Sequence, residues 1–305
     1  MVVMARTRHL FGMLSVVAMA ALAFALPPTP SPSPLSARIE SLYAQRLQGV
    51  NSPDQAQQIE KIFQQNGLPT NAAVGEDAAT DYIVLLADTP ADFIGQILPA
   101  VRGAADAGTI WPDAYLFLHA QLARKDMLQM ASIQKPGAPE LGVAIHQLVQ
   151  LDQLAYSRAD ADPKQVAVLE GQVRFGIQNI LQQYGMPTYT MVGVPATQEF
   201  FGLMKHQPDR LLHTVLPALQ QVLDRGEGDP QTFAVLFDRI RTNQGDPQTY
   251  GTQIVCSKEG QRIPWKIGSE KHLDHRRAAL GLEPERCYLD KELRHPQPCT
   301  IAQKR

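Results

Sequence analysis

Apolar residues recur at three- and four-residue steps along most of the chain, which is the pattern of amphipathic helices. The clearest stripe lies on one helix face at Val166, Leu169, Val173, Ile177, Ile180 and Leu181. Gly185 and Pro187 then end that helix, because glycine suits the position after a helix and proline cannot continue one. The same pattern predicts further helices at 53–66, 77–87, 91–107, 112–131, 141–156, 195–205, 208–223 and 230–240.

The helical pattern is duplicated. The string QQNGLPTNAAVG at 64–75 matches QQYGMPTYTMVG at 182–193, an offset of 118 positions. QILPAVRGAADAG at 96–108 parallels TVLPALQQVLDRG at 214–226 with the same offset. Self-similarity at a fixed spacing indicates repeated structural units. We therefore predict a mainly α fold in which two tandem degenerate helical repeats form packed bundles.

The pentapeptide GDPQT occurs twice and predicts different structures. At the first copy, Asp229 is a good helix N-cap, and the apolar string TFAVLFDRI follows. The second copy precedes β-branched segments around a glycine, which predicts a small β-hairpin of Thr249–Cys256 and Gln261–Ile267 near the C-terminus. Pro264 restricts its strand to a sheet edge. A helix at 271–280 is expected to follow.

The N-terminus has the layout of a secretory signal peptide. Arg6 and Arg8 precede the apolar run LFGMLSVVAMAALAFAL, and small residues at 23 and 25 offer a cleavage site. An uncleaved membrane anchor is the alternative, although the run is short for a spanning helix. The expected layout is signal peptide 1–25, Pro/Ser-rich spacer 26–36, first repeat 37–134, linker with helix 135–161, second repeat 162–290 and tail 291–305. Such a protein is secreted or periplasmic.

The composition and the absence of certain motifs exclude several classes of binding partner and cofactor. A formal net charge of −2 argues against a nucleic-acid binder, since such proteins neutralise phosphates with basic residues. The chain has no nucleophile elbow, zinc-ligand pattern or glycine-rich phosphate loop, so no cofactor or metal is expected. Cys256, Cys287 and Cys299 allow one disulfide and one spare thiol in an oxidising compartment, with the pairing left open.

Several short motifs of the second repeat resemble the DUF6624 family, a bacterial domain of unknown function, over roughly 163–290. The string YGTQ with a spaced Asp-Arg pair is the most specific of them. Two departures from the family pattern are Met186 in place of tryptophan and KHQ in place of QHA at 205–207. The matching residues are Gly185–Pro187, Val192-Gly193, His206, Asp238-Arg239, Tyr250–Gln253, Arg276-Arg277 and Gly281-Leu282. The resemblance implies a site but no reaction.

The first repeat lacks these polar groups. Asp88 stands at the position of His206, Ala120 or His119 stands at that of Asp238, and YGTQ has no counterpart. We therefore expect any site to lie in the second repeat, with the first as a structural duplicate.

Asp238 and His206 are the candidate catalytic residues. Asp238 falls among apolar helix positions, where an unpaired carboxylate is costly. It is either a general acid/base or a structural partner of Arg239, Arg241 or Arg277. His206 is a base, a metal ligand or a core histidine bonded to a carbonyl group. The last is favoured, because no second metal ligand accompanies it at the usual spacing.

Gln248, Tyr250, Thr252 and Gln253 are the candidate ligand-binding residues, together with Arg239 and Arg277. On a strand, the first three would share one face and Gln253 the other. Uncharged polar groups beside an aromatic ring suit a polar small molecule, a glycan or a peptide. The alternative is that the glutamines satisfy buried backbone groups where the hairpin meets the helices.

The leading hypothesis is an exported binding or structural module of the cell envelope with a polar pocket in the second repeat. The alternative is a hydrolase-like enzyme that acts on a polar envelope polymer with Asp238 as acid/base. A third hypothesis, an interaction module, requires a contiguous exposed apolar patch on residues 77–131.

Overall fold

The computed structural model describes residues 33–156, 162–258 and 260–293. The predicted signal peptide and Cys299 lie outside the described residues. None of the helices in these ranges is both long and apolar enough to cross a bilayer.

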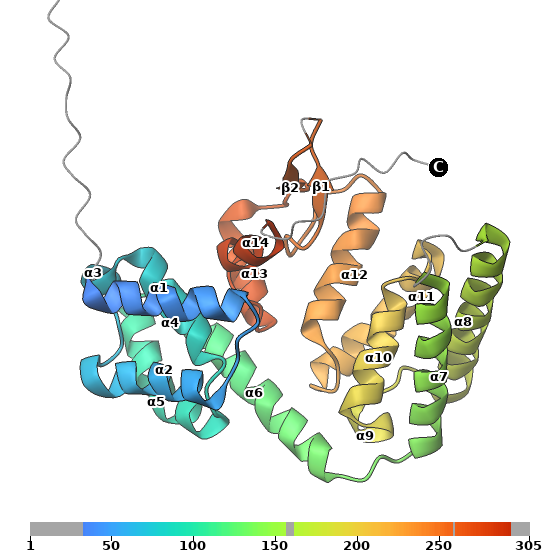
Figure 1. Ribbon diagram of the computed structural model, residues 1–305, viewed down its shortest axis with the longest axis horizontal. Helices are drawn as coiled ribbons and strands as arrows, with labels where there is room; N and C mark the ends of the chain where they lie inside the picture. Colours follow the sequence, from blue (N-terminus) through green and yellow to red (C-terminus); the bar gives the residue numbers. More distant parts are fainter. Residues whose placement is uncertain (1–32, 157–161, 259, 294–305) are drawn as a thin grey trace, which may run out of the picture. The chain divides into compact units, whose positions relative to one another are not determined.

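The fold is mainly α-helical with one small hairpin, as the sequence predicts (Figure 1). The first repeat contains α1 (Pro34–Leu47), α2 (Pro53–Asn66), α3 (Asn71–Val74), α4 (Glu76–Leu86), α5 (Ala91–Asp106) and α6 (Ala114–Ile133). The second contains α7 (Pro139–Tyr156), α8 (Pro163–Tyr184), α9 (Tyr189–Val192), α10 (Val194–Met204), α11 (Asp209–Asp224) and α12 (Pro230–Asn243). The C-terminal segment contains β1 (Ile254–Cys256), β2 (Arg262–Pro264), the 3-10 turn η1 (Glu270–His272), α13 (Leu273–Ala279) and α14 (Glu285–Leu293).

The repeat seen in the sequence recurs in the helices. The C-terminal ends of α2 and α8 are 118 residues apart, and both ends of α3, α4 and α5 differ from those of α9, α10 and α11 by the same 118. The glycine after α2, Gly67, has φ 69°, and its counterpart Gly185 has φ 76°. Each repeat also has a proline inside its fifth helix, Pro99 in α5 and Pro217 in α11.

Helix starts follow local capping chemistry. Ser52, Asp162 and Asp229 each accept a hydrogen bond from a backbone N–H of the first turn, and proline follows each of them. Ser33 caps α1 in the same way, so the helix begins at Pro34 and the predicted spacer of 26–36 is too long at its C-terminal end.

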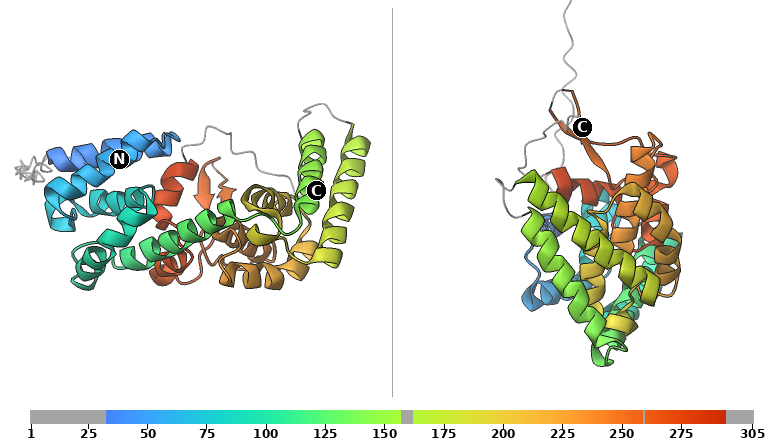
Figure 2. Two further views of the ribbon diagram at one scale, coloured as in Figure 1. Left: turned by 90° about the horizontal axis from the view of Figure 1, so that it is seen from below. Right: turned by 90° about the vertical axis from the view of Figure 1, so that its right-hand side faces the viewer.

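Each repeat has its own hydrophobic core. In the first, α1 packs on α4 and α5 on α6; in the second, α7 packs on α8 and α10, and α11 on α12. Figure 2 shows α7 and α8 side by side in both views. The helix at 139–156, expected as a linker, thus packs within the second repeat as α1 does within the first.

The C-terminal segment completes the core of the first repeat. Ala278 from α13 and Cys287 from α14 are both fully buried in the cluster that α1–α6 form. The Tyr43 hydroxyl of α1 donates a hydrogen bond to the Cys287 carbonyl oxygen at 3.4 Å. The sequence did not predict α14, which runs past the expected end of the second repeat at 290.

The predicted hairpin is present but shorter than expected. Only Ile254–Cys256 and Arg262–Pro264 pair as antiparallel strands, with Ile254 opposite Pro264. Residues 249–253 leave the strand because Gly251 adopts φ 70° and turns the chain. The expected alternation of Gln248, Tyr250 and Thr252 on one strand face was therefore wrong.

The cysteines divide into a bonded and a free group. Cys256 is disulfide-bonded, whereas Cys287 is a free thiol with no exposed surface. Burial raises the pKa of the Cys287 thiol to about 12, so the thiol stays protonated at pH 7 to 9. Because the thiolate is the reactive form, native Cys287 should resist alkylation.

Iodoacetamide at pH 8 should leave the tryptic peptide CYLDK, which contains only Cys287, unmodified in the native protein and label it fully in guanidinium chloride. Peptide mass spectrometry under non-reducing conditions reads the result. Rapid labelling of this peptide in the native protein would show that α14 does not stay docked on the first repeat.

Candidate functional site

Asp238 lies on α12 with no exposed surface, and the loop after it closes over its carboxylate. The backbone N–H groups of Thr249, Tyr250 and Thr252 donate hydrogen bonds to its two oxygens over 2.6 to 3.1 Å. The Thr252 hydroxyl adds another at 2.9 Å. Several N–H donors on one carboxylate are a strong, charge-assisted arrangement.

The arginines nominated as partners of Asp238 bind elsewhere, so the expected ion pair was wrong. Arg239 donates to the carbonyl oxygens of Lys205 and Gln207, and Arg241 donates to that of Pro247. The physical reason is the turn at Gly251, which points three backbone N–H groups at the carboxylate and leaves no place for a guanidinium.

Arg277 is buried and stabilises the loop that covers Asp238. Its guanidinium donates to the carbonyl oxygen of Tyr250 and, at 2.7 Å, to that of Glu283. Its Cζ lies 4.9 Å from the centre of the Tyr288 ring, a cation–π distance. Burial lowers the pKa of Arg277. The neighbouring Arg276, which the sequence analysis left without a role, donates to the carbonyl oxygens of Thr249, Gly268 and Ser269.

The two glutamines satisfy backbone groups. The side chain of Gln248 accepts from the N–H of Gln253 at 2.7 Å and donates to the Trp265 carbonyl oxygen at 2.9 Å. The side chain of Gln253 donates to the Val235 carbonyl oxygen of α12 at 3.1 Å. Of the two interpretations of these glutamines, ligand binding and the satisfaction of buried backbone groups, the geometry matches the second.

Tyr250 and Gly251 complete the loop. The Tyr250 ring packs against Phe233 and Phe237 of α12, with ring centres 6.3 and 5.8 Å away, and burial raises its pKa. Gly251 adopts φ 70°, which favours glycine, and a Cβ there would lie 3.3 Å from Glu285 Oε1, a tight contact that the Glu285 side chain would have to relieve. We call the assembly of Asp238, residues 248–253, Arg276, Arg277 and Tyr288 the clasp.

His206 is separate from the clasp. Its Nδ1 lies 2.8 Å from Asp152 Oδ2 of α7, and its ring centre is 4.8 Å from that of Tyr156. About half of its side chain is exposed. The structure therefore does not bring the two candidate catalytic residues, His206 and Asp238, together.

The structure also bears on metal binding and on the interaction-module hypothesis. Among the described residues no group of three metal-ligating side chains converges, and His275 instead contacts Asp113 at 2.8 Å. On residues 77–131, Met130 alone is an exposed large apolar residue, so that surface has no contiguous apolar patch.

A polar cavity of about 670 Å³ borders the clasp. Val235, Leu282 and Tyr288 line it from the clasp side, and α6, α10 and the C-terminal segment supply other walls. Its charged and amide lining residues are Arg46, Gln121, Arg124, Gln198, Lys205, Asp229, Gln231, Glu283, Lys291 and Glu292. Asp238 does not line this cavity. The sequence analysis missed this site because its residues come from segments far apart in the chain.

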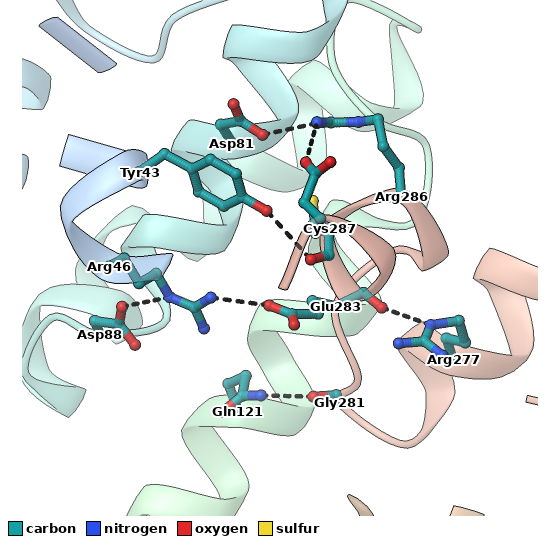
Figure 3. A network of polar contacts seen from close by, with 11 residues as sticks. Tyr43, Arg46, Asp81, Asp88, Gln121, Arg277, Gly281, Glu283, Arg286 and Cys287 are labelled. Atoms are coloured by element: carbon teal, nitrogen blue, oxygen red, sulfur yellow. Dashed lines mark hydrogen bonds and ion pairs between the residues drawn. The ribbon is translucent and has the colours of Figure 1, made fainter. Parts of the chain in front are cut away.

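Ion pairs fix the wall of the cavity that joins the C-terminal segment to the first repeat (Figure 3). Arg46 of α1 lies between Asp88 and Glu283, at 2.7 and 2.9 Å. Gln121 of α6 donates to the Gly281 carbonyl oxygen, and Arg286 of α14 pairs with Asp81 of α4 at 2.7 Å. The cavity wall is thereby tied to both the clasp and the first repeat.

Comparison with known proteins gives one match. The model of a family described as a family of unknown function, DUF6624, matches residues 140–293, just over half of the chain. No curated protein and no solved structure matches. The matched range includes the clasp and excludes the first repeat.

Proposed function

This chain belongs to the DUF6624 family, and from its geometry we propose that it is a binding module whose polar cavity takes a negatively charged, hydrogen-bonding small molecule. The ligand is either a free molecule or the acidic group of a glycan or peptide. The clasp serves this function by holding α12 and Tyr288 in place beside the cavity.

The state of the charged groups in the cavity carries the proposal. The carboxylates are already paired: Asp229 with Arg124 at 2.8 Å, Glu283 with Arg46 at 2.9 Å and Glu292 with Arg262 at 3.7 Å. In contrast, the ammonium groups of the exposed Lys205 and Lys291 and the amides of Gln198 and Gln231 form no hydrogen bond or ion pair with the described residues.

Unpaired cations and free amides favour a ligand that brings negative charge and hydrogen-bond acceptors. Lys205 and Lys291 both line this cavity. A carboxylate or phosphate between them would gain charge-assisted hydrogen bonds, which are stronger than neutral ones. The volume of about 670 Å³ lies within the range of roughly 300 to 1,000 Å³ usual for small-molecule sites.

The geometry does not favour the hydrolase hypothesis. A general acid/base must reach the proton that it transfers. The Asp238 carboxylate is buried, and its oxygens accept hydrogen bonds from three backbone N–H groups and a hydroxyl. It supports the clasp rather than reacting with a substrate.

The N-terminal sequence supports an envelope location for this binding module. Its basic start, apolar run and small residues at 23 and 25 have the order of a secretory signal. Sugar acids and acidic peptide ends are anions available in that compartment as parts of polymers.

A thermal-shift panel tests the proposal directly. Citrate, inorganic phosphate, glutamate and glucuronate are compared with neutral glucose and cationic arginine. We expect at least one of the anions, and neither of the other two compounds, to raise the Tm. Replacing both Lys205 and Lys291 by glutamine should raise the Kd of that anion at least tenfold, because each lost charged hydrogen bond is worth about 1.5–3 kcal/mol.

The matched control replaces two exposed lysines outside the cavity, Lys61 and Lys135, which lowers the net charge equally. This control should retain binding. Equally weakened anion binding in both double variants would mean that binding depends only on net charge, and the cavity would not be the binding site. So would an anion response that neither variant changes.

A further inference from the structure

A groove lies between α8 and α11 of the second repeat, away from the clasp. Its volume is about 760 Å³, and its apolar surface includes Leu181, Met186 and Leu211. Arg174 of α8 and Arg210 of α11 line the same groove. Both arginines are exposed, and the guanidinium of neither contacts a carboxylate among the described residues.

In the first repeat, larger side chains occupy the positions that correspond to this groove. At the offset of 118, Leu181 corresponds to Phe63 of α2 and Leu211 to Phe93 of α5. These two phenylalanine rings pack edge to face with centres 5.9 Å apart. Two leucines in place of an aromatic pair leave space, because they occupy less volume and do not stack across it.

The charge of the residues around the groove also differs from that of their counterparts in the first repeat. Arg174 corresponds to Ala56, and Arg210 corresponds to Asp92. A third lining residue, the neutral Gln178, corresponds to the acidic Glu60. At these positions the second repeat therefore has two fewer carboxylates and two more guanidinium groups than the first, around an apolar groove.

We propose that the groove between α8 and α11 is a second binding site, and that it takes a small amphipathic anion. Arg174 and Arg210 bind the carboxylate or sulfonate of the ligand, because the guanidinium fork matches the geometry of such groups. Leu181, Met186 and Leu211 contact its apolar body. Met186 suits this role because its flexible, polarisable side chain adapts to different shapes.

The groove differs from the polar cavity in what it offers. The cavity has lysines and amides and suits a polar anion, whereas the groove combines two arginines with an apolar surface. The two sites share no lining residue. The proposal of this second site therefore does not depend on the proposed function of the polar cavity.

Fluorescence titration with 8-anilinonaphthalene-1-sulfonate, an anionic apolar probe, tests the proposal on the full chain. We expect saturable binding to the parent protein. The double variant Arg174→Gln/Arg210→Gln should raise the Kd at least tenfold. The double variant Leu181→Phe/Leu211→Phe, which copies the first repeat, should weaken binding as strongly by filling the groove.

Two controls separate the groove from general effects. Lys164→Gln/Arg225→Gln removes two exposed cations associated with the same two helices but outside the groove, and it should bind the probe like the parent. The neutral probe N-phenyl-1-naphthylamine has similar rings without the sulfonate. It should bind more weakly and be indifferent to the arginine replacements.

Thermal unfolding first establishes that each variant is folded. If the phenylalanine variant does not fold, the arginine variant still decides, because both of its changes are on exposed side chains. Probe binding that the arginine replacements leave unchanged overturns the site. The same holds if the control pair weakens binding as much, or if the neutral probe binds as tightly as the anionic one.

Discussion

Replacement of Asp238 by alanine should lower the free energy of unfolding by about 3–5 kcal/mol, among the largest losses for one substitution. The change removes the acceptor of the buried N–H groups of Thr249, Tyr250 and Thr252 and of the Thr252 hydroxyl. Each buried donor left without a partner costs about 1–3 kcal/mol. Asparagine in place of Asp238 should be destabilising too, because its NH₂ group would face N–H donors.

Urea denaturation followed by circular dichroism measures this loss. Asp246→Asn is the matched control, because Asp246 precedes the same loop and is exposed, with no side-chain partner among the described residues. It should change stability by less than about 0.5 kcal/mol. A loss below 1 kcal/mol for the alanine variant would show that the loop does not depend on Asp238, and the clasp would need a different explanation.

A shortened chain that begins at Lys135 should fail to fold cooperatively, although it contains the whole matched family range. Without the first repeat, Ala278 and Cys287 lose the core that buries them. Arg46 and Gln121, which bind Glu283 and the Gly281 carbonyl oxygen, are lost as well. The C-terminal segment would then expose apolar surface and leave polar groups without their partners.

Thermal melts and limited proteolysis compare this fragment with a chain that begins at Ser33, which keeps every described helix and the N-cap of α1 and should melt like the parent. Addition of a separate 34–134 fragment should restore protection of the 270–293 region. A shortened chain that melts cooperatively at the temperature of the parent would contradict the assignment of the C-terminal segment to the first core.

The helices could be predicted because their signals are local. Asp229 combines a capping side chain with a following proline and starts α12 as expected, and Ser52 and Asp162 start α2 and α8 by the same local chemistry. The repeat made the prediction stronger, since two copies of a pattern support each other. The limits of α4 and α5 were predicted to within one residue for the same reason.

The partner of Asp238 could not be predicted in the same way. Its sequence neighbours show that the carboxylate is buried and needs a partner, and arginines are the obvious candidates by charge. The actual partners are backbone N–H groups, which every non-proline residue has, so residue type gives no signal. Only the path of the chain through Gly251 brings them to Asp238.

The polar cavity was beyond prediction for a related reason. Arg46 and Lys291 line the same space although most of the chain separates them. No local pattern connects such positions. The groove between α8 and α11 is an intermediate case, because the exchange of Phe63 and Phe93 for leucines is visible once the offset is known.

The bond between Tyr43 and Cys287, 244 residues apart, has a consequence for the order of folding. A chain that emerges from its N-terminus presents α1–α6 first, yet their core lacks Ala278 and Cys287 until the last helices arrive. Contacts between such distant segments form slowly, because a long loop must close first. The first repeat is therefore synthesised first, but its core is completed last.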